Sequence, residues 1–340
     1  MAKNKIVYNG QTLIDLTGDN VIESDVAQGK IFHKADGTQA IGTASVGGGD
    51  TLYDAYYQTG FTYENDVMTN VPDYMFTASK IVSIDLPNAT NVGDYAFRQC
   101  SALTSVDIPN LETVGTYAFY NCAGITTISF SDLTTLGNYS FYGCTEATTL
   151  ALPSCTTIGQ WALYNCRKLT NIVLPEVTEV QSRGLAGSTF SAEHARTVSL
   201  PKCTTLANYA MQYTALTSVS LPVIQSIGSN QWENCSYLES LTLPASFNGV
   251  VPGSMCTRCS GLEEVIFEGN VVSVATNAFN NCTSCLVYDF SHCTSIPTLA
   301  NVNAFNGINE NAQIKVPAAL EEDWKWAQRW YQLESHIVGV

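Results

Sequence analysis

The chain has 340 residues, of which 13% are charged, and its formal net charge is −15 at pH 7. An acidic chain with so few lysines and arginines is a poor ligand for nucleic acids and for anionic membrane surfaces. The sequence has no apolar run long enough to span a bilayer, so we expect no membrane insertion.

The first 44 residues predict a small β-rich module. Residues 5–17 have strand-like sequence on both sides of Asn9-Gly10, a pair that favours a tight hairpin turn. A short helix that ends at a glycine is predicted over residues 21–30, and a second hairpin turns at Asp36-Gly37. The module has no apolar secretory core, so we expect synthesis in a reducing cytosol without a signal peptide.

This block resembles the N-terminal modules of tail and fibre proteins from phages of gut and other Gram-positive bacteria. The resemblance implies a virion protein that contacts other tail proteins through residues 1–44 and forms a homo-oligomer. The candidate attachment residues are Tyr8, Leu13, Ile14, Leu16 and Phe32. The matching positions are Tyr8-Asn9-Gly10, Leu13-Ile14-Asp15-Leu16-Thr17, Gly29, His33, Asp36-Gly37 and Gly42-Thr43.

Residues 45–70 predict a linker followed by a cap. Gly47-Gly48-Gly49 has the composition of a flexible joint. The aromatic segment 50–70 is expected to cover the first unit of the region that follows, because the end of a repeat array needs a cap.

From residue 71 to 316 the sequence repeats about every 22 residues. Cys100, Cys122, Cys144 and Cys166 are 22 apart, and each closes a phrase such as Val92-Gly-Asp-Tyr-Ala-Phe-Arg-Gln-Cys100. A fixed period of this length predicts a stacked solenoid, since one unit alone has too little partner surface to bury its apolar face. A short alternating strand pattern follows each phrase and ends at Leu86, Ile108, Phe130, Leu152, Leu174, Leu200, Leu221, Leu243, Phe267, Phe290 and Val316.

The Leu-Pro and Ala-Phe-x-x-Cys phrases at this spacing resemble the BspA-like leucine-rich repeats. The resemblance implies a leucine-rich-repeat solenoid of parallel β-strands with short helical or 3-10 turns, in about eleven units of ~22 residues. Two units depart from the pattern. Residues 181–197 carry an insertion and lose the cysteine, and residues 297–303 lengthen another bend.

All twelve cysteines fall on repeat positions, where a free thiol acts as a small apolar core residue. Cys256-x-x-Cys259 and Cys282-x-x-Cys285 have the spacing of a zinc ribbon. On a solenoid these four side chains occupy different slots and do not converge, so we expect no metal and no cofactor. Disulfides between adjacent coils are sterically conceivable, and a ladder of reduced thiols is the favoured interpretation.

One slot of the repeat carries an aromatic side chain in several units. It is filled by Tyr95, Tyr117, Tyr139, Trp161 and Tyr209, and Tyr120, Tyr142 and Tyr164 follow three residues later. A spacing of three on a helical turn places both on one face, which predicts an aromatic wall. These eight residues are the candidate binding surface for a host glycan or protein, and ordinary packing within the repeat is the alternative. A Ser/Thr-rich strand face, which includes Ser105 and Thr127, is a competing surface.

Residues 317–340 predict a helical C-terminal cap. Pro317 suits the first turn, and the acidic residues 321–323 lie where they stabilise the helix dipole. Trp326, Trp330 and Leu333 are at helical spacing and are expected to cover the last coil. This tail also resembles the C-terminal ends of phage-encoded repeat proteins.

No catalytic motif accompanies these repeats. The four histidines form no metal-ligand pair, and paired carboxylates point to different sides or into solvent. His194 lies with Arg183 and Arg196 in the inserted loop, where a solvated loop is favoured over a ligand site. We therefore predict a protein that is not an enzyme, namely a phage tail or fibre-like appendage that adheres to the host surface. The alternatives are a bacterial surface adhesin of the BspA-like class and, less favoured, a tail-associated glycan hydrolase.

Overall fold

The computed structural model describes four N-terminal strands and then residues 60–187, 196–247 and 249–340. By its internal contacts the chain divides into two compact units, Met1–Cys155 and Thr156–Val340. Tyr8, Leu13, Ile14 and Phe32 fall on the described N-terminal strands. Leu16, the Gly47-Gly48-Gly49 joint, the helix predicted over residues 21–30 and the histidine at 194 lie outside the described residues.

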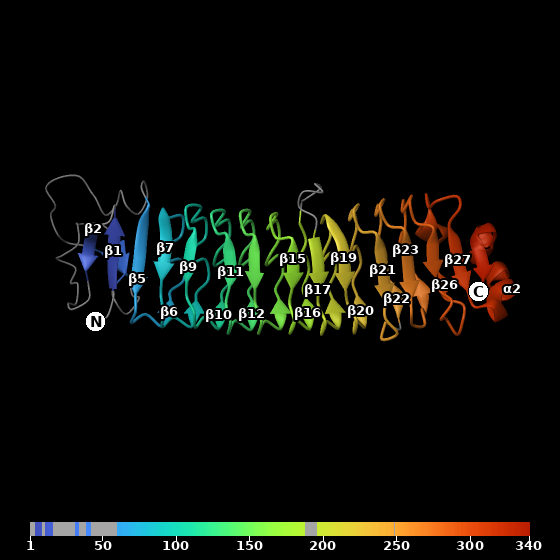
Figure 1. The fold of residues 1–340 in the computed structure, drawn as a ribbon, viewed down its shortest axis with the longest axis horizontal. Helices are drawn as coiled ribbons and strands as arrows, with labels where there is room; N and C mark the ends of the chain where they lie inside the picture. Colours follow the sequence, from blue (N-terminus) through green and yellow to red (C-terminus); the bar gives the residue numbers. More distant parts are fainter. Residues whose placement is uncertain are drawn as a thin grey trace. The chain divides into compact units, whose positions relative to one another are not determined.

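The N-terminal unit is a parallel-β solenoid in which each coil contributes one longer and one two-residue strand (Figure 1). Equivalent strands of successive coils pair in parallel, so that Ser83 lies beside Ser105 and Thr113 beside Thr135. The longer strands are β5 (Phe61–Asn65), β7 (Ile81–Asp85), β9 (Ser105–Asp107), β11 (Thr127–Ser129) and β13 (Thr149–Ala151). The short strands are β6 (Asn70–Val71), β8 (Asn91–Val92), β10 (Thr113–Val114) and β12 (Thr135–Leu136).

The two predicted N-terminal hairpins are present. Strand β1 (Asn4–Tyr8) pairs antiparallel with β2 (Gln11–Asp15), and β3 (Ile31–His33) pairs antiparallel with β4 (Gln39–Ile41). Strand β1 also pairs antiparallel with β5, with Ile6 opposite Tyr63. The hairpin therefore covers the edge of the first coil, whose backbone N–H and C=O groups would otherwise be an open template for other chains.

The C-terminal unit is built in the same way (Figure 1). Its longer strands are β15 (Asn171–Val173), β17 (Arg196–Ser199), β19 (Leu216–Ser220), β21 (Ser240–Leu243), β23 (Glu264–Phe267), β25 (Val287–Asp289), β27 (Gln313–Val316) and β28 (Ile337–Gly339). Its short strands are β14 (Thr157–Ile158), β16 (Glu179–Val180), β18 (Thr205–Leu206), β20 (Ser226–Ile227), β22 (Val250–Val251), β24 (Ser273–Val274) and β26 (Thr298–Leu299).

The described residues of the two units make about twelve coils, one more than the eleven predicted strands, because β5 precedes the first of them. Alternation along each strand sends one side chain inward and the next outward, as in β11, where Ile128 is buried between exposed Thr127 and Ser129. The repeat period therefore identified both the strands and the side chains that form the core.

Two internal ladders hold successive coils together. The rings of Phe76, Phe97 and Phe119 stack with centroids 5.2 and 5.1 Å apart. The Sγ atoms of Cys100 and Cys122 donate to the carbonyl oxygens of Phe76 and Phe97, both at 2.9 Å. A thiol thus fills a small apolar space and also gives a buried carbonyl of the preceding coil a second hydrogen bond, which alanine does not do. All twelve cysteines are buried and free, as predicted.

The Ala-Phe-x-x-Cys arc is not the helical turn that the spacing predicted. The N–H groups of Tyr95 and Phe97 donate to carbonyls of the next coil at 2.9 and 2.7 Å, while the N–H of Arg98 donates back to Tyr95 at 3.1 Å. Backbone N–H groups therefore alternate between bonds within the coil and bonds to the next one. Among the described residues only the last copy, η3 (Val302–Phe305), is a 3-10 helix.

The C-terminal cap differs from the single helix predicted for it. It consists of η4 (Ala318–Leu320), α2 (Glu321–Trp326) and η5 (Trp330–His336), and the break falls at Arg329, whose φ is 68°. Because of this break Trp324 is fully buried and Trp326 is 78% exposed, so the prediction that Trp326 covers the last coil was wrong. Trp330 and Leu333 are buried as predicted. No helix in the described part of the chain is long and apolar enough to cross a bilayer.

Candidate binding surface

Each coil from residue 74 to 277 places one residue in the left-handed backbone region just before the Ala-Phe segment. We call these positions the left-handed row. In the N-terminal unit the row consists of Tyr74, Tyr95, Tyr117 and Tyr139, with φ between 56° and 60°. In the C-terminal unit it consists of Trp161, Arg183, Tyr209, Asn230, Ser254 and Asn277, with φ between 55° and 64°.

A left-handed conformation is unfavourable for large side chains. It costs roughly 1–2 kcal/mol per residue, except for glycine and to some extent asparagine and aspartate. Most arcs have a second left-handed position four residues further along, and Asn121, Gly143 and Asn165 are among its occupants. The tyrosines of the row are therefore not the residues that this backbone itself prefers.

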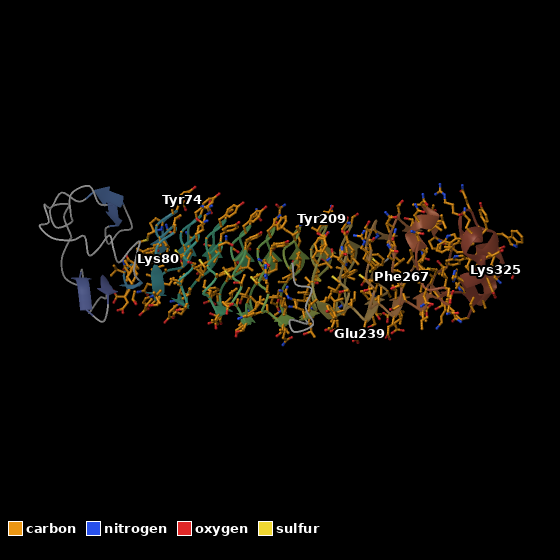
Figure 2. All side chains as sticks on the ribbon, turned by 90° about the horizontal axis from the view of Figure 1, so that it is seen from above. Tyr74, Lys80, Tyr209, Glu239, Phe267 and Lys325 are labelled. Atoms are coloured by element: carbon orange, nitrogen blue, oxygen red, sulfur yellow. The ribbon has the colours of Figure 1, made fainter. Side chains whose placement is uncertain are left out.

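In the N-terminal unit the row forms one column of stacked rings, which we call the tyrosine column. The centroids of Tyr74 and Tyr95 are 4.8 Å apart, those of Tyr95 and Tyr117 are 4.9 Å apart, and those of Tyr117 and Tyr139 are 4.6 Å apart. The ring planes deviate from parallel by 3° to 10°. Tyr74, labelled in Figure 2, is 56% exposed, and the other three rings are half-buried.

A second, shorter stack lies beside the column. Tyr120 and Tyr142 are 4.8 Å apart, and Tyr120 is 5.3 Å from Tyr117 at a tilt of 57°. Arg98 takes the equivalent place in the preceding coil, with its guanidinium carbon 5.8 Å from the Tyr120 centroid. The structure thus brings Tyr95, Tyr117, Tyr120, Tyr139 and Tyr142 into one continuous surface of the N-terminal unit.

The stacking decides which part of these rings a ligand could reach. Both faces of Tyr95 and Tyr117 lie against neighbouring rings, so only ring edges and phenol oxygens remain. Partial desolvation, followed by the neighbouring phenols of Tyr139 and Tyr95, raises the pKa of Tyr117, so its hydroxyl stays protonated at neutral pH. The column therefore offers hydrogen-bonding edges, and a sugar ring stacked on a tyrosine face inside it would have no space.

In the C-terminal unit the row contains a cation between two rings. The guanidinium carbon of Arg183 lies 4.6 Å from the Trp161 centroid and 4.0 Å from the Tyr209 centroid. Tyr164 packs beside Trp161 at 4.6 Å with a tilt of 59°. Arg183 was predicted to lie in a solvated loop, and that prediction was wrong. Aligning Val180-Gln-Ser-Arg183 with Val92-Gly-Asp-Tyr95 would have placed it in the aromatic slot.

A family model for the BspA type leucine rich repeat region matches this chain in six copies over residues 69–192 and 185–286. The chain belongs to this BspA-type family. The resemblance based on Ala-Phe-x-x-Cys is thereby confirmed, whereas the N-terminal module that resembles phage fibre proteins lies outside the matched residues. No curated protein matches.

Solved leucine-rich-repeat structures are similar to this BspA-type chain. A leucine-rich repeat protein from Bacteroides ovatus ATCC 8483 is 19% identical with a TM-score of 0.51, over 82% of this chain and 83% of that chain. A leucine rich cell surface protein from Faecalibacterium prausnitzii A2-165 is 20% identical over 82% of each chain, with a TM-score of 0.43. At this identity the first structure shows the fold alone.

The insertion in this BspA-type solenoid brings a second correction. Arg196, also predicted to lie in the solvated loop, is 1% exposed and points into the core of the C-terminal unit. Its Nη2 donates to the carbonyl of Cys166 at 2.5 Å, and its Nε has no partner among the described residues. Burial lowers the pKa of Arg196. The buried cation interrupts the thiol ladder where the repeat loses its cysteine.

The zinc-ribbon-like cysteines do not form a metal cluster. No three His, Cys, Asp or Glu side chains of the described residues are grouped so that they could hold a metal ion. Cys259 and Cys282 donate instead to backbone carbonyls of Trp232 and Cys256 at 2.9 and 3.1 Å. Burial raises the pKa of Cys259 and Cys282 well above the usual thiol value and that of Cys285 to about 11, so these thiols stay protonated.

Proposed function

We propose that this BspA-type solenoid is a non-catalytic adhesion protein and that the tyrosine column is part of its binding surface. The observation that carries the proposal is a run of four tyrosines at left-handed positions, where asparagine occupies the equivalent position in other coils. Residues held in a disfavoured backbone region without a folding need are often functional.

The energies support a binding role over a purely structural one. Each left-handed tyrosine costs roughly 1–2 kcal/mol in backbone strain. Stacking against the neighbouring ring returns about 0.5–1.5 kcal/mol. Folding stability alone therefore gives little reason to keep Tyr95, Tyr117 and Tyr139 in place of asparagine, and a ligand accounts for the choice.

The exposed chemistry favours a ligand with repeated polar groups. The column presents one phenol per coil on side chains with few free torsions, and the ring centroids of Tyr74 and Tyr95 are 4.8 Å apart. Binding therefore costs little conformational entropy, because the tyrosine side chains are already held in place by stacking. A surface polysaccharide with regularly spaced oxygens fits this edge, and a protein surface with exposed backbone carbonyls is the other partner of that kind.

The family supports a bacterial cell surface as the place where this adhesion occurs. The resemblance of residues 8–43 to phage fibre modules favours a second placement, on a virion, with residues 1–44 attached to other tail proteins and several copies assembled together. The solenoid has the same task in both cases, because the column is on the repeats and the β1–β2 hairpin is on the edge of the first coil.

Adsorption of the full chain to bacterial cells tests the column. The variant Tyr95→Asn/Tyr117→Asn/Tyr139→Asn should keep its fold, because asparagine is native to this row, and should lose tenfold or more in cell-bound protein. The matched control Thr127→Asn/Ser129→Asn/Thr149→Asn changes three exposed strand residues of the same unit and should adsorb like the wild type. Unchanged adsorption of the tyrosine variant would exclude the column as the binding surface.

A separate measurement decides the placement. Antibodies against the chain should detect it either on intact cells of the bacterium that encodes it or in purified phage particles. Labelling of cells alone supports the adhesin. Labelling of particles, lost when residues 1–44 are deleted, supports the virion appendage.

A further inference from the structure

We propose that Arg183 is the binding site for the carboxylate of an acidic saccharide. This inference rests on the proposed adhesion function and assigns a ligand class to the part of the left-handed row in the C-terminal unit. It depends on three features: a fixed guanidinium that has no hydrogen-bond or ion-pair partner among the described residues, a face of Tyr209 over which no described ring lies, and short polar side chains beyond that face.

Among the described residues, the guanidinium of Arg183 is held through its flat faces. Trp161 and Tyr209 cover these faces at 4.6 and 4.0 Å. Arg183 makes no side-chain hydrogen bond or ion pair with any described residue. An arginine has five N–H donors in one plane, so the donors of Arg183 are left at the edge of the stack.

Three other arginines of the same unit differ in this respect. Arg167 donates from Nε to Asn165 at 2.7 Å, and Arg329 donates to the carbonyl of Leu299 at 2.8 Å. Arg196 donates to the carbonyl of Cys166. Their side chains serve the fold, whereas the N–H groups of Arg183 are directed to no acceptor in the described protein.

A carboxylate is the ligand group that matches this edge. It accepts two parallel N–H bonds from a guanidinium, and stacking on aromatic rings fixes the plane in which those bonds form. Glu233 lies on the Asn230 arc, two coils away from Arg183, and its Oε2 accepts from Gln212 at 2.7 Å and from Asn230 at 2.8 Å. It therefore does not compete for Arg183, although the chain carries many more acids than bases.

The end of the aromatic run next to Arg183 favours a saccharide. Tyr209, labelled in Figure 2, is the last ring of the row, and Asn230, Ser254 and Asn277 continue it with shorter side chains. The outer part of the Tyr209 face turned toward Asn230 therefore has no ring of the described residues over it, unlike the faces inside the tyrosine column. A sugar ring can stack there, with polar side chains beside it and the fork of Arg183 across the ring edge.

Direct titration of the full chain tests this site. The probes are a galacturonate trisaccharide and a sialylated trisaccharide, each compared with its neutral methyl ester and with a glutamate-rich peptide of equal charge. Isothermal titration should show saturable binding of at least one acidic saccharide, tenfold or more weaker binding of its ester, and no saturable binding of the peptide. Binding of the peptide in place of the saccharides would overturn the saccharide assignment.

Variants locate the binding. Arg183→Asn introduces the residue found at the same left-handed position in other coils, so it should fold and should bind the acidic saccharide at least tenfold more weakly. Arg258→Asn removes the same charge at another left-handed position of the same unit, outside any aromatic stack, and should bind like the wild type. If both variants lost the same saccharide affinity, the loss would reflect the net charge of the protein, and the assignment of the site to Arg183 would be wrong.

The two proposals fail differently. If the wild type binds neither acidic saccharide nor distinguishes acid from ester, the Arg183 site is wrong, while adsorption to cells through the tyrosine column can still be intact. If the column variant adsorbs normally and Arg183→Asn alone loses saccharide binding, the Arg183 site stands and the column does not.

Discussion

The left-handed row has the same backbone conformation in both units but different side chains. Tyr117 in the N-terminal unit has a φ of 57°, and Asn277 in the C-terminal unit has a φ of 61°. Asparagine satisfies this conformation at little cost, whereas tyrosine does not. The turn therefore requires only a backbone geometry, and the side chain at this position can differ from coil to coil.

The cores of the two units do not show this difference. Cys122 in the N-terminal unit and Cys259 in the C-terminal unit both donate at 2.9 Å to the carbonyl of an aromatic residue in the preceding coil. Apart from the buried Arg196, which interrupts the ladder of the C-terminal unit, the distinction between the units therefore lies on the surface and in the number of thiols. Four cysteines lie in Met1–Cys155 and eight in Thr156–Val340.

The largest expected effect is unfolding at alkaline pH, which should begin in the C-terminal unit. Burial raises the pKa of Cys235 to about 12 and that of Cys203 to about 11. The folded state therefore keeps protons that the unfolded chain loses above about pH 8.5, so stability is full below that pH and falls as the pH rises. The loss is about 1.4 kcal/mol per pH unit for each such thiol.

Hydrogen exchange measured between pH 8 and pH 10.5, corrected for intrinsic rates, checks this order. Segments of the C-terminal unit should lose protection first, and Cys203→Ala/Cys285→Ala should move that loss to higher pH. Earlier opening of the N-terminal unit would contradict the thiol argument.

A large and equal effect is expected from the phenylalanine ladder of either unit. Phe119→Ala and Phe279→Ala each remove a fully buried ring, and each should lower the free energy of unfolding by about 3–5 kcal/mol. Urea titration of the two variants checks this. If one loss is several-fold smaller than the other, the cores of the two units are not equivalent.

Swapping asparagine and tyrosine in the left-handed row should change the free energy of unfolding by a smaller amount, and the two swaps should differ. Asn277→Tyr should lower the free energy of unfolding by about 1–2 kcal/mol, because the new ring has the strain without a stacked neighbour. Tyr117→Asn should change it by less than about 1 kcal/mol, since relief of strain offsets the lost stacking. Thermal unfolding of both variants measures the difference. If both substitutions destabilised the protein equally, the claim that asparagine fits this backbone position better than tyrosine would be wrong.

The smallest effect should come from a single thiol of the ladder. Cys122→Ala keeps the packing volume nearly unchanged and removes one of the two hydrogen bonds to the Phe97 carbonyl, which still accepts from the N–H of Cys100 at 3.1 Å, so the change should cost at most about 1 kcal/mol. Cys259→Ala should cost the same, because its geometry is the same. Urea titration at pH 7 resolves both, and a change of several kcal/mol would mean that the thiols have a role beyond this bond.

The regular part of the fold could be read from the sequence because it depends on local periodicity. The spacing of Cys100, Cys122 and Cys144 identified the coils, and the alternation in Thr127–Ser129 identified the inward side chains. The twelfth coil was missed because the residues before Phe61–Asn65 do not have the Ala-Phe-x-x-Cys phrase that opens the most regular coils. The aromatic slot was found as well, and its residues do lie together within each unit.

The missed features depend on backbone geometry and tertiary packing. Nothing local to Tyr117 indicates a left-handed φ, so the arc was read as helical and the rings were expected to offer their faces. Arg196 was assigned to solvent because a charged side chain in an irregular segment is usually exposed. The break at Arg329 moved burial from Trp326 to Trp324, and helical spacing cannot anticipate a break that tertiary contacts impose.

The uniform pairing of successive coils has a consequence for how this chain can change length. A tandem duplication of one 22-residue unit, such as residues 101–122, would insert a coil that pairs with its own copy on one side and with an original neighbour on the other. Its phenylalanine, its thiol and its tyrosine would each enter an existing stack, and neither terminal cap would change. Each such event would add one phenol to the tyrosine column, so the reach of the column can be altered by whole coils during evolution without designing a new core.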